Sequence, residues 1–143
     1  MSGACPNVVR KAADVTSRHR AIQLGFLLSA VMAVTATVLM LLPPQATKTV
    51  SVSVNDKIMH FVAFFMIVLP AIAVRPSVWV WVLPIAIVLG GMIEIVQPFF
   101  GRGRELGDFI ADVLGATLAV PVGRLLHHVI SQGWQLHKAK RAN

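Results

Sequence analysis

Five of the six carboxylates in this chain lie between residues 56 and 112, inside or beside strongly apolar segments. Several of them have a polar neighbour three or four positions away, a spacing that places both side chains on one face of a helix. These sets are Asp56 with His60, Glu94 with Gln97, and Asp108 with Asp112. Charged groups in a membrane helix are costly, so their clustering indicates a binding site, a proton relay or a pairing network.

These residue types support acid–base chemistry and the binding of ions. His60 beside Asp56 has the composition of an acid–base pair, and the candidate catalytic residues are His60, Asp56, Glu94 and Asp108. Arginine suits bidentate recognition of phosphate, and the candidate substrate-binding residues are Gln97, Arg102, Arg104, Asp112 and Lys57. No metal is assigned, although a divalent cation could be held by Glu94, Asp108 and Asp112. The cluster contains no serine or cysteine nucleophile.

Each candidate also has a structural explanation. His60 could be a buried histidine that a carboxylate satisfies, and Glu94 with Gln97 could join helices by hydrogen bonds. Asp108 fits a helix start, where an acid offsets the helix dipole, but Asp112 lies one turn deeper. The two arginines could form salt bridges to Glu94, Glu105 or Asp108, and Lys57 could extend to the membrane interface.

The composition indicates an integral membrane protein. The 143 residues are 56% hydrophobic, the mean hydropathy is +0.73, and the apolar residues form long runs. The net charge of +7 comes mostly from the two ends of the chain. No basic stripe is interleaved with aromatic residues, so contact with anionic lipid explains this charge better than nucleic acid does. The single cysteine, Cys5, excludes an internal disulfide.

Four apolar segments are long enough to cross a membrane, at residues 21–42, about 56–74, about 78–97 and about 108–126. The first is too long for the apolar part of a signal peptide. The sequence therefore predicts an all-α, four-helix transmembrane bundle over residues 21–126. It further predicts a basic cytoplasmic tail over residues 1–20, and an interfacial helix with a basic tail over residues 127–143. Residues 45–55 should form a loop, with alternating valines that also fit a short extended piece.

The basic residues predict the orientation of the bundle. With four spans, both ends and the 75–77 turn share one side, which holds nine Lys and Arg residues against four on the other side. The positive-inside rule then places both ends in the cytoplasm. All the sets of acids fall on the opposite face, where the three helices could form a polar cup that opens outward. Small residues at four-residue spacing favour close helix contact, namely Ala111, Gly115, Ala119 and Gly123, and Ala86 with Gly90.

The ordered set of polar motifs resembles the VanZ-like family. The set comprises D-K-x-x-H-F at residues 56–61, E-x-x-Q at residues 94–97, G-R-x-x-x-D at residues 103–108, and Gly115. The resemblance covers about residues 20–126, and one departure is Asp112, where the family usually has Asn. It implies a multi-pass protein of the bacterial inner (cytoplasmic) membrane that works in cell-envelope or polysaccharide metabolism, or in teicoplanin (glycopeptide antibiotic) resistance.

Three functions stay open at this point. The first is binding or processing of a lipid-linked envelope precursor or an anionic lipid headgroup, with the partner a membrane lipid or a polyprenyl-linked molecule. The second is a non-catalytic assembly factor with a protein partner, in which the charges fix helix register. The third is an ion-coupled carrier, in which Glu94 and Asp112 relay protons. The sequence leaves open whether the protein is an enzyme.

Overall fold

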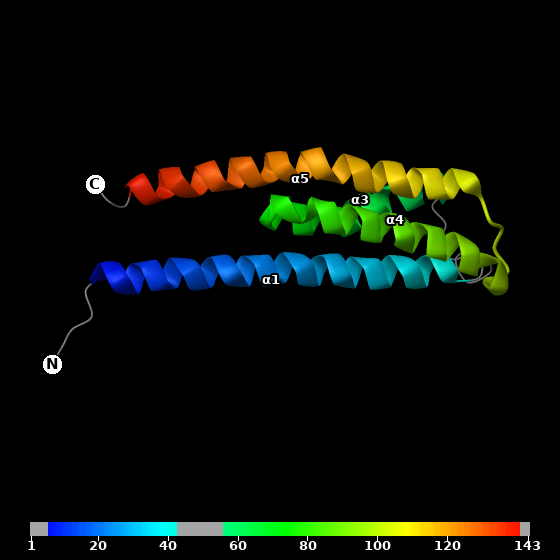
Figure 1. Cartoon of the computed structure of the whole chain (residues 1–143), viewed down its shortest axis with the longest axis horizontal. Helices are drawn as coiled ribbons and strands as arrows, with labels where there is room; N and C mark the ends of the chain where they lie inside the picture. The colour runs from blue at the N-terminus through cyan, green and yellow to red at the C-terminus, as the bar shows by residue number, and fades with distance from the viewer. Residues whose placement is uncertain (1–5, 43–55, 141–143) are drawn as a thin grey trace.

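The computed structural model describes the backbone of residues 6–42 and 56–140, and the side chains of residues 15–42 and 56–135. The described part consists of helices joined by short connections, without a strand, as predicted (Figure 1). Its elements are α1 (Pro6–Leu41), α3 (Asp56–Val74), the 3-10 helix η1 (Pro76–Val78), α4 (Trp79–Val96), the 3-10 helix η2 (Gln97–Phe100) and α5 (Leu106–Lys140). The extended piece considered for residues 45–55 lies outside the described residues.

The four long helices differ in length by almost a factor of two. Helices α1 and α5 have 36 and 35 residues, which corresponds to about 54 and 52 Å. Helices α3 and α4 have 19 and 18 residues. The longer pair extends beyond the shorter pair in one direction, so Pro6 and Lys140 lie at the same end of the bundle (Figure 1). We call this the proximal end, and the opposite end, where α3 and α5 begin, the distal end.

The outer parts of α1 and α5 differ from the prediction. The sequence suggested a tail up to residue 20 and a separate interfacial helix from residue 127, whereas the structure has one continuous helix in each place. An apolar span already provides the costly helix nucleus, and adding residues to an existing helix is cheap. Residues 127–140 contain no proline, and their single glycine, Gly133, does not end the helix.

The surface of the bundle suits a lipid environment. Four helices are long and apolar enough to cross a membrane, at Val15–Leu41, Asp56–Val74, Pro76–Phe100 and Leu106–Gln135. Only 11% of the most apolar window of α1 and 39% of that of α5 is buried inside the protein. Exposed apolar surface on this scale is unfavourable in water but not in hydrocarbon. These features indicate a multi-pass membrane protein.

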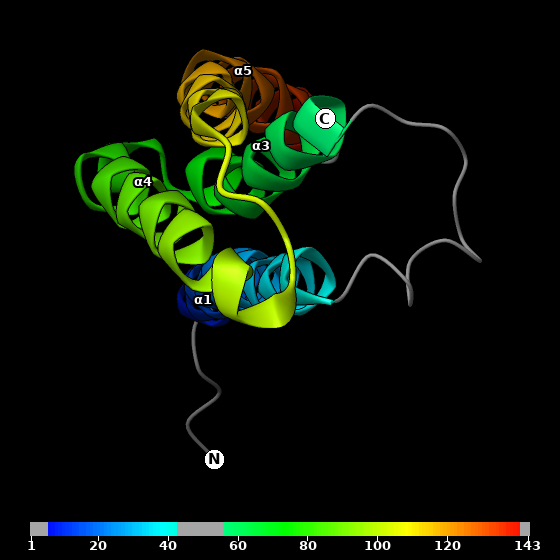
Figure 2. The same cartoon turned by 90° about the vertical axis from the view of Figure 1, so that its right-hand side faces the viewer.

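Helix α3 lies between α1 and α5, as the view from the distal end shows (Figure 2). Small residues permit its close packing, as the sequence predicts. A Cβ on Gly115 of α5 would overlap the carbonyl oxygen of Phe61, and one on Gly123 would lie 2.8 Å from Ile72 Cβ. On the other side of α3, a Cβ on Gly25 of α1 would lie 2.5 Å from Val74 Cγ2. Close contact on both sides fixes the register of the helices that carry the polar residues.

A serine of α1 compensates for a proline in the middle of α3. Pro70 lacks an N–H and disturbs the hydrogen-bond ladder of its helix. The following N–H, of Ala71, donates to Ser29 Oγ at 3.2 Å. Polar side chains of neighbouring helices commonly satisfy such backbone groups inside membranes.

Candidate functional site

Three helices bring polar side chains together at the distal end of the bundle. Helix α3 begins there, α4 ends there and α5 begins there, so the first turns of two helices meet the last turn of the third. Five buried polar residues result, which we call the distal cluster: His60 (0% exposed), Glu94 (5%), Gln97 (1%), Asp108 (2%) and Asp112 (0%). The sequence motifs thus converge as expected. The cluster is closed and is not the outward-opening cup that the sequence suggested.

His60 forms its closest polar contact with a residue of another helix. Its Nδ1 lies 2.9 Å from Asp112 Oδ1, and its Nε2 lies 4.0 Å from Asp108 Oδ2. An ionised carboxylate only accepts hydrogen bonds, so Nδ1 is the donor beside an ionised Asp112, and in a neutral ring Nε2 then carries a free lone pair. The residue closest to the His60 ring is therefore Asp112 of α5, whereas Asp56 offers an atom within 4.8 Å of the ring and bonds to Arg102.

Glu94 is held by the loop that follows its own helix. Its Oε2 accepts a hydrogen bond from the backbone N–H of Glu105 at 3.0 Å, and Arg104 Nε donates to the carbonyl oxygen of Glu94 at 3.4 Å. Gly101, with φ of 77°, provides the left-handed turn that starts the return of this loop. The loop thus covers the end of α4 and fixes one oxygen of the carboxylate.

Two sets of ion pairs lie over the distal cluster. Lys57 Nζ lies 2.6 Å from Glu105 Oε2 and 3.2 Å from Asp108 Oδ1, and Arg102 lies 2.7 Å from Asp56 Oδ2. We call these contacts the outer ion pairs. Lys57 therefore turns inward over the cluster rather than extending along the membrane interface. Arg102 pairs with Asp56, a partner that the sequence did not suggest.

Gln97 links two other helices. Its Nε2 donates to the backbone carbonyl of Met40 at 3.3 Å, near the end of α1. A joint clasp of Glu94 and Gln97 is not seen; Gln97 alone connects α4 to α1, while Glu94 bonds to the loop. The distal cluster is consequently tied to all four long helices.

Several atoms of the distal cluster have no hydrogen-bond partner. They are His60 Nε2, Glu94 Oε1, Gln97 Oε1 and Asp112 Oδ2, all fully buried. His60, Glu94 and Asp112 also each offer a metal-ligand atom within 4.8 Å of the other two. Buried polar atoms normally find partners. Their convergence therefore indicates a place for a ligand, a cation or an additional proton.

Three further residues shape this site: Gly90, for which the sequence predicts close helix contact, Glu105, which the sequence offers only as a salt-bridge partner of the arginines, and Gly107, which sequence reasoning missed. Gly90 lies so close to α5 that an added Cβ would be 2.8 Å from Asp112 Oδ2. Gly107 similarly leaves room for Lys57, whose Cε would be 2.7 Å from a Cβ there. Glu105 supplies both a backbone donor to Glu94 and a carboxylate to Lys57. The close approach of α5 to Gly90 confirms the prediction from the spacing of the small residues.

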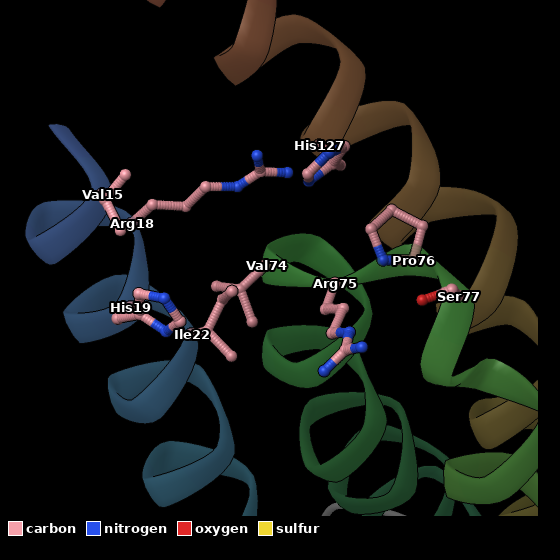
Figure 3. A pocket seen from close by; sticks show the side chains of 9 residues that line it. All are labelled: Val15, Arg18, His19, Ile22, Val74, Arg75, Pro76, Ser77 and His127. Atoms are coloured by element: carbon pink, nitrogen blue, oxygen red, sulfur yellow. The ribbon is translucent and has the colours of Figure 1, made fainter. Parts of the chain in front are cut away.

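No family model, curated protein or solved structure matches this chain. The resemblance to the VanZ-like family therefore rests on the quoted motifs alone. The structure also contains a second polar region, far from the distal cluster. It is a cavity of about 540 Å³ at the proximal end, lined by residues of α1, α5 and the turn after α3 (Figure 3).

Proposed function

We propose that this chain is a VanZ-like protein of the bacterial cytoplasmic membrane, with its distal end on the outer side. Its distal cluster binds the polar headgroup of a lipid-linked envelope precursor or of an anionic lipid, in cell-envelope metabolism or glycopeptide resistance. One observation carries this proposal: His60 Nε2, Glu94 Oε1 and Asp112 Oδ2 are buried together without partners. Each such atom costs free energy until a ligand satisfies it.

Arg104 is the residue best placed to hold a phosphate. It is exposed, and the hydrogen bond that the structure gives it runs from Nε to the Glu94 carbonyl oxygen at 3.4 Å. That contact holds the guanidinium beside the distal cluster while its terminal nitrogens stay available. A guanidinium can bind two phosphate oxygens at once, which a lysine cannot do.

The outer ion pairs offer a way into the closed cluster. The Lys57 and Glu105 side chains are 45% and 60% exposed, and exposed ion pairs contribute about 1 kcal/mol or less. An anionic headgroup could therefore separate Lys57 from Glu105 and take its place. Lys57 would then add a second positive charge to the headgroup site.

The experiment compares two lipids that differ only in the phosphate. We expect the purified protein in nanodiscs to bind a polyprenyl phosphate at least about tenfold more tightly than the matching polyprenol, equivalent to about 1.4 kcal/mol. Arg104→Lys should abolish most of this difference while the Tm stays unchanged. Arg124→Lys is the matched control, because Arg124 lies at the other end and stacks on Trp79 with 5.1 Å between Cζ and the ring centre.

Equal binding of the polyprenyl phosphate and the polyprenol would contradict the proposal, as would an equal loss of binding in the two arginine variants.

A scaffold function is the second candidate, because the His60–Asp112 bond joins α3 to α5 and Gln97 joins α4 to α1. In that case Glu94→Gln and His60→Asn should lower abundance and envelope function together, since an unpaired buried charge costs about 3–5 kcal/mol. A headgroup site predicts stable Glu94→Gln protein that has lost function.

A further inference from the structure

We propose that His60, Glu94 and Asp112 form a buried site for one divalent transition-metal ion. The three side chains come from α3, α4 and α5, and one ligand atom of each lies within 4.8 Å of the other two. In a tetrahedral site with bonds of about 2.1 Å, neighbouring ligand atoms lie about 3.4 Å apart. Each side chain therefore needs to move by less than about 1 Å to complete the coordination.

Each of the three residues has one atom that the protein fixes and one that is free. His60 Nδ1 bonds to Asp112 Oδ1 at 2.9 Å, and Glu94 Oε2 accepts from the Glu105 N–H at 3.0 Å. The second atoms, His60 Nε2, Glu94 Oε1 and Asp112 Oδ2, lack partners. In Glu94 the hydrogen bond to one oxygen orients the carboxylate and leaves the other oxygen for an ion, an arrangement common in metal-binding residues. An ion between His60 and Asp112 would take the place of their direct hydrogen bond.

The charge of the site also favours a cation. Two ionised carboxylates and a neutral imidazole would carry a charge of about −2 in a region closed to water, which is costly without compensation. Lys57 and Arg102 are already paired with Glu105, Asp108 and Asp56, and Arg104 bonds to the backbone carbonyl oxygen of Glu94 and not to its carboxylate. A divalent ion between the three residues would neutralise the two carboxylates.

A neighbouring group of residues is a weaker candidate. Asp56, His60 and Asp108 also offer ligand atoms within 4.8 Å of one another. Asp56 is 51% exposed and bound to Arg102, and Asp108 is bound to Lys57. A metal there would have to compete with two ion pairs, so we assign the ion to the buried group. Asp108 Oδ2, 4.0 Å from His60 Nε2, can serve as an additional ligand.

The donor set indicates the class of ion. One imidazole nitrogen with carboxylate oxygens suits Zn²⁺ or Mn²⁺ better than Mg²⁺ or Ca²⁺, which prefer oxygen alone. Three protein ligands leave a coordination position open, as in sites where the metal contacts a substrate. A phosphate oxygen could fill that position; this last step rests on the proposed function, whereas the metal site does not.

The test measures metal directly and contains no envelope lipid. The full chain is purified in detergent, stripped with a chelator, loaded with Zn²⁺ or Mn²⁺ and dialysed, and the bound metal is counted by mass spectrometry. We expect about one ion per chain, and a Tm raised by roughly 5 °C on loading. Glu94→Gln and Asp112→Asn should each reduce retention at least tenfold, while Asp56→Asn, the matched control, should retain the ion.

Absence of bound metal in the native protein would overturn the inference, and so would equal retention in the Glu94→Gln and Asp56→Asn variants. X-ray absorption of the loaded native protein provides a readout that needs no variant, with one nitrogen and at least two oxygen ligands expected. An all-oxygen shell would place the ion elsewhere. Metal binding without headgroup binding would leave this inference standing while refuting the proposed function.

The proximal cavity carries a second and independent inference. Two adjoining cavities of about 540 and 600 Å³ share residues from α1, α3 and α5. Their lining includes Arg18, His19, Arg75 and His127, and no Asp or Glu. Arg18 extends from α1 toward His127 (Figure 3). Several basic groups around one cavity without an acid among its lining residues favour an anionic ligand.

We infer that this proximal pocket binds the headgroup of an anionic glycerophospholipid. Its other wall is apolar and includes Ile22, Val74, Ile130 and Trp134, which suits the glycerol and upper acyl chains. Val74 is the last residue of α3, so the pocket lies where a spanning helix leaves the hydrocarbon layer. His127 is held in place by a bond from its Nδ1 to the Ala73 carbonyl oxygen at 2.8 Å, which leaves Nε2 for a ligand.

Native mass spectrometry tests this inference on the full chain. After equilibration with equal phosphatidylglycerol and phosphatidylcholine, we expect at least fivefold more phosphatidylglycerol retained per chain. Arg18→Gln combined with Arg75→Gln should bring the ratio close to one, whereas Arg20→Gln, outside the lining, should leave it unchanged. Equal retention of both lipids, or no effect of the double variant, would refute a lipid site. If inorganic phosphate alone displaces the bound phosphatidylglycerol, the pocket is a site for free phosphate and the lipid site is refuted.

Discussion

At the scale of single residues, the chemistry of this protein depends on which atoms of the buried acids are already engaged. Glu94 and Asp112 each use one oxygen in a hydrogen bond, while the other oxygen is buried without a partner. Gly90 makes this arrangement feasible, because it lets the α4 backbone approach the Asp112 carboxylate. A residue without a side chain thus sets the position of a functional carboxylate.

Replacing Gly90 by Ala should disturb the distal cluster. The new Cβ would lie 2.8 Å from Asp112 Oδ2, so the carboxylate or the helix must move, and we expect a loss of roughly 1–3 kcal/mol of stability. Thermal unfolding in detergent measures this loss. Gly91→Ala is the matched control: its Cβ meets Phe109 Cε2 at an ordinary 3.6 Å, so the helix propensity of Ala should keep it neutral or slightly stabilising. Equal Tm values for the two variants would contradict the importance of this contact.

At the scale of elements, the contact between α3 and α5 determines the site. His60 and Asp112 meet across this contact, and Gly115 lies against the backbone of α3 one turn further along α5. Because Asp112 and Gly115 lie one turn apart on the same helix, a displacement of α5 at Gly115 also moves Asp112. The element that positions the site is therefore a pair of helices and not either helix alone.

Gly115→Ala should separate the two helices. Its Cβ would overlap the Phe61 carbonyl oxygen and lie 3.1 Å from the Phe65 nitrogen, and backbone atoms cannot turn aside as a side chain can. We expect a loss of more than about 2 kcal/mol in stability, with weaker metal retention in the same sample. Gly133→Ala on the same helix has open space around its Cβ and should be neutral or stabilising. A Gly115→Ala protein as stable as the Gly133→Ala protein would show that α3 and α5 are not held so closely.

At the scale of the whole molecule, the two ends of the bundle differ in charge. The proximal end has the overhangs of α1 and α5 and the cavity that contains Arg18 and Arg75. The distal end contains five acids, and the structure pairs its Lys57 and Arg102 with three of them. The positive-inside rule assigns the proximal end to the cytoplasm.

Cysteine labelling tests that orientation. In a Cys5→Ser background, Gly101→Cys should react with a membrane-impermeant thiol reagent in intact cells, because Gly101 is exposed at the distal end. Ala142→Cys should react only after the cells are opened. Reaction of Ala142→Cys alone in intact cells would invert the topology and would place the distal cluster in the cytoplasm.

Hydrophobic runs of sufficient length determined much of this protein by themselves. The span predicted at residues 56–74 agrees with α3, Asp56–Val74, because 19 consecutive residues without a helix-ending turn can form only a helix in hydrocarbon. The convergence of His60, Glu94 and Asp112 was likewise predicted, since unpaired charges at that depth are too costly to face lipid. A helix after residue 127 was predicted as a separate interfacial element, but its continuity with the span as far as Lys140 was not.

Tertiary structure alone decided which polar atoms meet. Spacing along one helix suggested Asp56 for His60, but the glycine-mediated approach of α5 gave Asp112 that place and left Asp56 to Arg102. The same packing closed the site beneath Lys57 and Glu105 and left one atom each of His60, Glu94 and Asp112 without a partner. Sequence spacing describes neighbours within a helix, whereas these contacts depend on the distance and register between helices.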